Sequence, residues 1–88
     1  MLKFKFFLST RNEPVQEGDV IYIFSDGYAD QFGGPKERKF MVKRFRELLQ
    51  KIHGESMQEQ RDILIQILED WKGDLPQIDD ILVIGIKI

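Results

Sequence analysis

The chain has 88 residues, 42% of them hydrophobic and 32% charged, with a formal net charge of −2 and no cysteine. This length suits one small domain, and the charge balance argues against a dedicated nucleic-acid-binding protein. The lack of cysteine excludes disulfides and thiolate metal sites and fits a cytoplasmic location. We expect no membrane span, because no apolar run approaches ~20 residues, and no signal peptide, because residues 1–8 are too short and carry lysines.

Strand patterns occur in three segments. Residues 2–8 alternate between apolar and other side chains and predict a strand. Residues 19–25 and 80–88 are apolar on both faces, which is typical of strands in a sheet covered on both sides. The intervening residues 9–18 and 27–36 are rich in Gly, Pro and polar residues, and they predict loops.

Two amphipathic helices are predicted before the last strand. The first runs from about residue 37 to 53, and Gly54 is placed to end it. The second begins with a capping box at Ser56-Met57-Gln58-Glu59 and ends near Gly73, before a turn at residues 74–78. Their apolar stripes recur at steps of three and four residues. The stripes comprise Met41, Phe45, Leu48, Leu49 and Ile52 in the first helix and Met57, Gln60, Leu64, Ile67, Leu68 and Trp71 in the second.

The resulting order β-β-α-α-β predicts an α+β fold. A small, mostly antiparallel sheet of about three strands would carry an antiparallel helical hairpin on one face, all within a single domain of residues 1–88. The other face of the sheet is also apolar, and no predicted element remains to cover it. We therefore expect a partner surface there, either a missing half of the domain or a second copy of the chain in a dimer or larger homo-oligomer.

Acidic residues stand where the second strand ends and where the third begins. Asp26 lies in Ser25-Asp26-Gly27, directly after the apolar run 19–25, and Asp79-Asp80 precedes the run 81–86. If the two strands pair, these carboxylates meet at one end of the sheet, where their mutual repulsion favours a bound cation. Hard divalent ions such as Mg²⁺ and Mn²⁺ prefer such oxygen ligands. Each motif alone is common in turns and strand starts, so the combination is what indicates part of a metal site.

This combination resembles the C-terminal part of the PPM (type 2C) metal-dependent protein phosphatases, in particular their bacterial stage II sporulation protein E (SpoIIE)-like branch. The resemblance covers roughly residues 15–88, including the predicted helical pair. Its matching motifs are Gly18-Asp19, Ser25-Asp26-Gly27, Asp30 and Asp79-Asp80-Ile81. Residues 24–34 resemble one bacterial subgroup, in which the phosphatase commonly ends a larger sensor protein. The resemblance implies that the chain is about the C-terminal third of an α-β-β-α sandwich.

The resemblance also implies an activity, the hydrolysis of phosphoserine and phosphothreonine in a phosphoprotein substrate. Two Mn²⁺ or Mg²⁺ ions would activate a bridging water for in-line attack on the phosphate. Asp26 and Asp79 match metal ligands of the family, and Asp80 is a supporting or alternative ligand. Ser25, Gly27 and Asp30 are expected to have a structural role near the site, and Asp19, like Asp30, is expected to bond turn or loop backbone.

The family pattern also contains an upstream Asp-Gly metal motif with a bridging aspartate, and residues 1–14 contain no aspartate. Two carboxylate positions by themselves hold a two-metal site poorly. We therefore expect weak or no phosphatase activity from the isolated chain. The alternative function is a non-catalytic, truncated remnant that acts as a self-associating protein-interaction module.

Other conspicuous residues have simpler interpretations. The basic cluster within residues 36–46 is either a solvated helix face or a surface for an acidic or phosphorylated protein. Gly33-Gly34 fits a flexible loop better than a phosphate cradle. Trp71 is interpreted as a core or interface anchor, and His53 as a solvated or capping residue.

Overall fold

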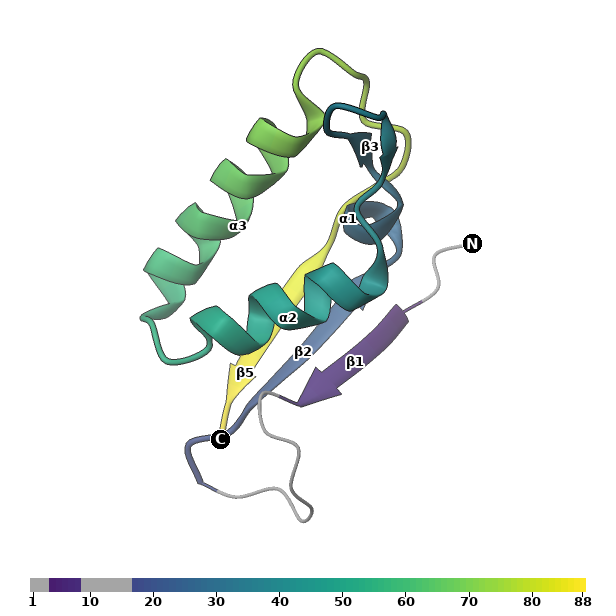
Figure 1. Cartoon of the computed structure of the whole chain (residues 1–88). Helices are drawn as coiled ribbons and strands as arrows, with labels where there is room; N and C mark the ends of the chain where they lie inside the picture. The colour runs from purple at the N-terminus through teal and green to yellow at the C-terminus, as the bar shows by residue number, and fades with distance from the viewer. Residues whose placement is uncertain (1–3, 9–16) are drawn as a thin grey trace.

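The computed structural model describes residues 4–8 and 17–88 and has the predicted α+β architecture (Figure 1). Its elements are, in chain order, β1 (Phe4–Leu8), β2 (Val20–Ser25), α1 (Gly27–Asp30), β3 (Phe32–Gly33), β4 (Arg38–Lys39), α2 (Val42–Ile52), α3 (Met57–Lys72) and β5 (Val83–Lys87). Both long helices lie on one face of the sheet, and in the view of Figure 1 they spread apart from the turn that joins them. In the described part of the chain, no helix is long and apolar enough to cross a membrane.

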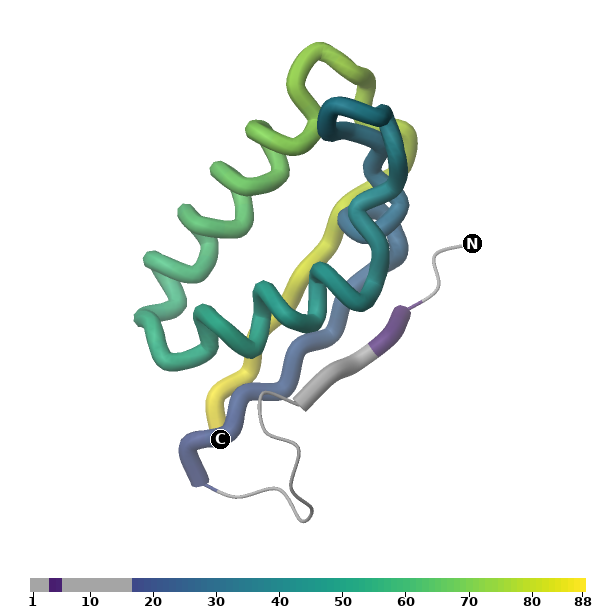
Figure 2. Tube along the Cα trace, in the orientation of Figure 1, coloured from purple at the N-terminus to yellow at the C-terminus, as the bar shows by residue number. Residues whose placement is uncertain are grey.

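The main sheet has three strands in the order β1-β2-β5, and both pairings are antiparallel. Phe4 of β1 lies opposite Ser25, and Ile84 of β5 lies opposite Ile23. The last strand, β5, therefore lies beside β2, and β1 lies on the other side of β2, as the trace in Figure 2 shows. Because β2 and β5 run in opposite directions, the end of β2 adjoins the beginning of β5.

The hydrophobic core lies between the sheet and the helices. Val20, Tyr22 and Phe24 alternate along β2 and are at most 1% exposed, as the period of a strand requires. The Phe45 ring of α2 packs edge-on against Phe24, with a centroid distance of 4.7 Å, and lies 4.6 Å from the ring of Tyr28. Burial of each such side chain contributes about 1.5–3 kcal/mol to stability.

Two tyrosines connect α3 to the rest of the core. The Tyr22 hydroxyl donates to Gln60 Oε1 at 2.6 Å, and the Tyr28 hydroxyl donates to the Leu64 carbonyl at 2.7 Å. The predicted capping box is confirmed in part, because the Ser56 hydroxyl accepts a hydrogen bond from the backbone N–H of Glu59. Gly73 is the C-cap of α3, as predicted.

The segment between β2 and α2 differs from the prediction. Residues 27–36 were expected to be a loop, but they contain the short helix α1 and strand β3. The next helix was expected from residue 37 but begins at Val42, because β4 and two backbone bonds hold the preceding residues extended. Phe40 N–H donates to the Gln31 carbonyl at 3.0 Å, and Met41 N–H donates to the Ala29 carbonyl at 2.8 Å. Sequence patterns could not reveal these pairings, since each joins residues some ten positions apart.

Other boundaries and stripe residues also need correction. Met41 and Met57, predicted on the apolar stripes, are both exposed, and Met41 has a positive φ of 83° before the first turn of α2. The last strand begins at Val83 instead of residue 80. Residues 2–3 of the first predicted strand and most of the predicted loop 9–18 lie outside the described residues.

The second face of the sheet carries exposed apolar side chains. Ile84, Ile86 and Ile88 are 42–46% exposed, and Phe4 on β1 is also exposed. No described helix covers this face, because α2 and α3 both lie on the opposite one (Figure 1). The prediction that both faces of the sheet are apolar is therefore confirmed, and the two long helices cover one of these faces.

Candidate metal-binding end of the sheet

Ser25 joins the end of β2 to the residues before β5. Its side chain is almost completely buried, and its hydroxyl donates to the Asp80 carbonyl at 3.1 Å and accepts from Leu82 N–H at 3.0 Å. Its own backbone N–H donates to the Leu82 carbonyl at 3.0 Å. One serine therefore extends the β2–β5 pairing beyond the strands and fixes residues 80–82 against the end of β2.

Gly27 allows the two acidic segments to approach each other. A Cβ atom at this position would overlap the carbonyl group of Asp80 and the side chain of Ile81. A side chain on residue 27 would therefore push the two backbones apart. The sequence motif Ser-Asp-Gly thus brings the backbone around Asp26 next to that of Asp80. This is the end of the sheet at which the two acidic segments were expected to meet if their strands pair.

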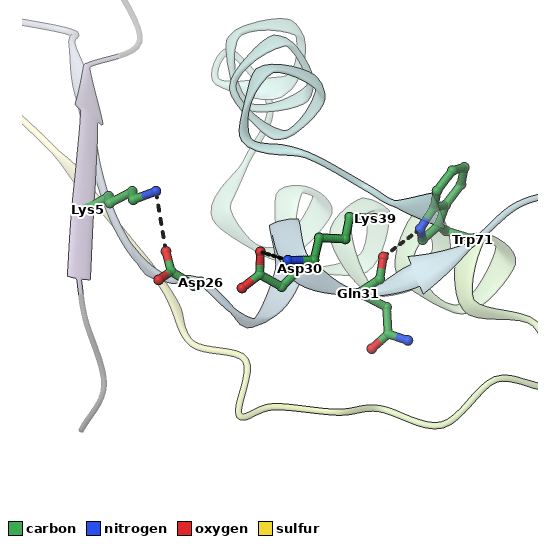
Figure 3. A network of polar contacts seen from close by, with 6 residues as sticks. All are labelled: Lys5, Asp26, Asp30, Gln31, Lys39 and Trp71. Atoms are coloured by element: carbon green, nitrogen blue, oxygen red, sulfur yellow. Dashed lines mark hydrogen bonds and ion pairs between the residues drawn. The ribbon is translucent and has the colours of Figure 1, made fainter. Parts of the chain in front are cut away.

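Asp26 precedes the first turn of α1 and has one unusual carboxylate oxygen. Its Oδ1 atom is buried and accepts no hydrogen bond from residues 4–8 or 17–88. The ammonium group of Lys5 on β1 lies 3.5 Å from this oxygen, close enough for an ion pair but without hydrogen-bond geometry (Figure 3). A buried carboxylate oxygen normally has a hydrogen-bond partner, so this atom has coordinating capacity that the described residues do not use.

Asp79 and Asp80 are both exposed on the approach to β5. The Asp79 carboxylate accepts a hydrogen bond from Asp80 N–H at 2.8 Å, and its backbone carbonyl accepts one from the Gln77 side chain. This short turn holds the segment in one conformation. It brings Asp80 to Ser25 and Gly27 through the backbone, while the Asp80 side chain projects to solvent.

The donor chemistry suits a hard divalent cation, but the set is small. Asp26 offers an unsatisfied oxygen, and carboxylates are the ligands that Mg²⁺ and Mn²⁺ prefer. Within residues 4–8 and 17–88, however, no three His, Asp or Glu side chains are grouped closely enough to hold a metal ion. The described residues therefore fit part of a coordination sphere.

Asp30 and Gln31, one turn beyond Asp26, support the neighbouring hairpin. Asp30 pairs with Lys39 of β4 at 3.7 Å (Figure 3). Gln31 is fully buried; its side-chain amide donates to the Pro76 carbonyl, and its own carbonyl accepts from the Trp71 indole at 2.9 Å. These contacts fit the anchoring role expected for Trp71, whereas the structural role of Asp30 stays a prediction.

Two residues near the site were not singled out from the sequence. Lys5 was treated only as an interruption in an apolar strand, although antiparallel pairing of residues 2–8 with 19–25 would have placed it near Asp26. Gln31 gave no signal, because a buried glutamine that bonds to backbone groups has no sequence pattern of its own. His53, by contrast, is the C-cap of α2, which agrees with its expected capping role.

Burial changes the acidity of the two core tyrosines. It raises the pKa of Tyr22 to about 12 and raises the pKa of Tyr28 further. Both phenols therefore remain neutral hydrogen-bond donors to α3 at physiological pH. Their role is to fix the helix on the sheet that carries the acidic end.

Comparison with known proteins identifies the family. The family model described as stage II sporulation protein E (SpoIIE) matches residues 3–88. The chain belongs to the SpoIIE family. The SpoIIE match begins at residue 3, earlier than the resemblance read from the motifs, so β1 and Lys5 are part of the family domain. No curated protein matches the chain in sequence.

A solved structure shows the same arrangement. The SiaA-PP2C domain of Pseudomonas aeruginosa matches this SpoIIE-family chain with a TM-score of 0.81 and 29% sequence identity. The match covers 85% of this chain and 31% of the SiaA chain. The chain is therefore a SpoIIE-like PP2C fragment in fold, spanning under a third of that relative.

Proposed function

We propose that this SpoIIE-family chain is the C-terminal part of a phosphoserine/phosphothreonine phosphatase domain, with residues 1–88 forming one unit. Asp26, Asp79 and Asp80 would provide ligands for Mn²⁺ or Mg²⁺. The observation that carries the proposal is the buried Oδ1 of Asp26, which accepts no hydrogen bond from the described residues and stands next in sequence to Gly27, where the backbone packs on the Asp80 carbonyl. A phosphoprotein substrate and a cytoplasmic location belong to the same proposal.

The chain's own residues have distinct tasks in this proposal. Ser25 and Gly27 hold the two acidic segments together, and Asp26 would offer a carboxylate oxygen that no described residue hydrogen-bonds. When bound, the metal ions would supply the activated water and neutralise the charge of the phosphate. The ammonium group of Lys5 contacts the Asp26 oxygen that would bind a metal ion. Lys5 would therefore compete with a cation for Asp26.

Binding is a better readout than activity for this chain. The described residues present too few grouped carboxylates for a complete two-metal site. We therefore expect weak metal affinity and weak or no phosphatase activity from the isolated chain. The remaining ligands would come from the other part of the domain, since the matched region is 31% of the SiaA chain.

The proposal is tested by an amide NMR titration of the 88-residue chain with Mn²⁺, whose unpaired electrons broaden nearby signals. We expect the signals of residues 25–27 and 79–81 to broaden first. Asp26→Asn should abolish this selectivity, whereas Asp62→Asn, which removes an exposed carboxylate of α3, should leave it intact. Broadening centred elsewhere, or equal effects of the two substitutions, would reject the ligand assignment.

Removing Lys5 should strengthen the same binding. Because its positive charge lies 3.5 Å from Asp26 Oδ1, Lys5→Gln should raise the apparent Mn²⁺ affinity by about three- to tenfold, measured from the same broadening. Lys39→Gln is the matched control, since Lys39 pairs in the same way with Asp30, which is not a proposed ligand. If both substitutions change the affinity equally, only the overall charge matters and Lys5 does not compete at the site.

The second candidate function is a self-associating interaction module without catalysis. Its specific support is the open sheet face, where Ile84, Ile86 and Ile88 remain exposed. The titration separates the two candidates, because a module of this kind needs no selective metal binding at residues 25–27. The open face itself is tested by a surface substitution described in the Discussion.

A further inference from the structure

The charge of the chain is divided unevenly between two regions. Residues 36–53 hold seven Lys and Arg but two Glu, a net charge of +5, whereas the whole chain carries −2. The remaining residues together therefore carry −7. A merely solvated helix face usually mixes both signs, so a one-sided concentration of this size indicates an interaction with negative charge.

Part of this positive charge is displayed on a rigid hairpin, formed by β3, β4 and the turn between them. Lys36, Arg38 and Lys39 are all exposed on it, which defines the basic hairpin. Lys36 and Arg38 make no ion pair with the described residues, and the ion pair between Lys39 and Asp30 is long, at 3.7 Å.

Trp71 holds the basic hairpin in place. Gly34 N–H donates to the Trp71 carbonyl at 2.9 Å, and a Cβ atom on Gly33 or Gly34 would collide with the backbone or ring of the same tryptophan. The guanidinium group of Arg44, on α2, lies over the Trp71 ring at 4.8 Å from the ring centroid. The basic side chains therefore project from a fixed backbone, which lowers the entropy lost when they bind.

The basic hairpin also lies close to the acidic end of the sheet. Four residues of α1 separate Asp26 from the end of the helix at Asp30, a rise of about 6 Å. The Lys39 ammonium group lies 3.7 Å from the Asp30 carboxylate, and Figure 3 draws this ion pair together with the one between Lys5 and Asp26. The positive charge therefore begins within roughly 10–15 Å of the proposed metal ligand, once the length of the Asp30 side chain is included.

We infer that the basic hairpin recognises acidic side chains near the phosphorylated residue of a protein substrate. An extended peptide advances about 3.3–3.6 Å per residue, so a carboxylate two to four positions from the phosphoresidue would reach the hairpin. The guanidinium group of Arg38 can bind a carboxylate through two parallel hydrogen bonds. The inference rests on the proposed phosphatase function and adds a substrate class, phosphoproteins with acidic flanking residues.

The test uses fluorescently labelled peptides and the full 88-residue chain with Mn²⁺, with binding followed by anisotropy. One peptide carries phosphoserine followed by glutamates, the second carries phosphoserine followed by lysines, and the third carries the glutamates with unmodified serine. We expect the first to bind about tenfold more tightly than the second, as several exposed ion pairs would provide. No preference between the first two would overturn the inference.

Two charge-reversal variants distinguish recognition by the basic hairpin from general electrostatic attraction between peptide and chain. Arg38→Glu should remove the preference for glutamate, whereas Arg61→Glu, the same change at an exposed position of α3, should preserve it. Far-ultraviolet circular dichroism and the fluorescence of the single tryptophan verify that both variants fold. Equal loss in both variants, or binding to anionic phosphatidylserine vesicles without binding to any peptide, would overturn the assignment to acidic phosphoproteins.

The peptides also distinguish this inference from the proposed function. If the unmodified glutamate peptide binds as tightly as the phosphorylated one and Arg38→Glu weakens both, recognition of acidic residues by the basic hairpin stands and the phosphate site fails. If both phosphopeptides bind equally and Asp26→Asn weakens both, the metal site stands and the surface fails. No binding of any peptide up to millimolar chain concentration would overturn both.

Discussion

The two faces of the sheet have nearly the same composition but different surroundings. On the helix side, Val20, Tyr22 and Phe24 are at most 1% exposed, whereas on the other side Ile84 and Ile86 are more than 40% exposed. Strands that are apolar on both faces are typical of sheets that are covered on both sides. The comparison shows that a well-packed core on one face and an exposed apolar surface on the other coexist in the described chain.

The largest expected effect lies on the covered face. Phe45 is fully buried and packs against Phe24 and Tyr28, so Phe45→Ala should lower the free energy of unfolding by about 3–5 kcal/mol. Urea denaturation followed by circular dichroism measures the change. A domain of this size has only modest stability, so the variant should be largely unfolded at room temperature.

The matched change on the open face is Ile84→Ala. This residue is already 42% exposed, so the substitution should cost less than about 1 kcal/mol in the monomer. A cost similar to that of Phe45→Ala would mean that the open face is covered in solution as tightly as the helix face. The two faces of the sheet would then contribute equally to stability in solution.

A second prediction concerns pH and also belongs to the covered face. Burial raises the pKa of Tyr22 to about 12, against 10.0 for a free tyrosine. Between pH 10 and 12 the unfolded chain loses this proton and the folded chain retains it, so stability falls as pH rises. The slope attributable to Tyr22 approaches about 1.4 kcal/mol per pH unit, with Tyr28 acting in the same direction.

Denaturation series at pH 9 and above measure this slope. Tyr22→Phe removes the ionisable group but keeps the ring, so its stability should fall less steeply over the same range. The slopes are compared, because the variant also loses the hydrogen bond to Gln60 and starts from a lower stability. Identical slopes in both proteins would show that Tyr22 does not stay protonated in the fold.

The contrast between the faces also explains which features the sequence could predict. Periodic features were predictable: the buried positions of β2, the stripe of α2 at Phe45 and Leu49, the Ser56 cap and the Gly73 stop. Period and capping depend on neighbouring residues and therefore leave a local pattern.

Features that depend on distant contacts were not predictable. Helix α1 and the basic hairpin depend on bonds from Trp71 to Gln31 and Gly34, some forty residues apart. The approach of the backbone around Asp26 to that of Asp80 was predictable only because two apolar strands were assumed to pair. The approach of Lys5 to Asp26 additionally required the strand order and register, which no local pattern supplies.

The smallest expected effect on stability, and the most informative on the open face, comes from Ile86→Lys. Ile86 lies opposite Ile21 in the β2–β5 pairing and is 46% exposed, so the substitution should change the free energy of unfolding by about 0.5 kcal/mol or less. If copies of the isolated chain cover each other's open faces, a lysine there would bury an unpaired charge in the interface. We therefore expect the unmodified chain to form dimers or larger species at high concentration and the variant to remain monomeric.

Light scattering over a range of concentrations distinguishes the outcomes, and Lys87→Gln provides a control at the neighbouring position, whose side chain points to the other face. An unmodified chain that stays monomeric at high concentration would show that exposed isoleucines alone do not drive association. The open face would then require the rest of a phosphatase domain as its specific partner. Only a complementary surface would make contacts strong enough to offset the entropy lost on binding. Association that persists in Ile86→Lys but is lost when an edge strand is altered would assign the contact to strand pairing, and the sheet face would remain available to that partner.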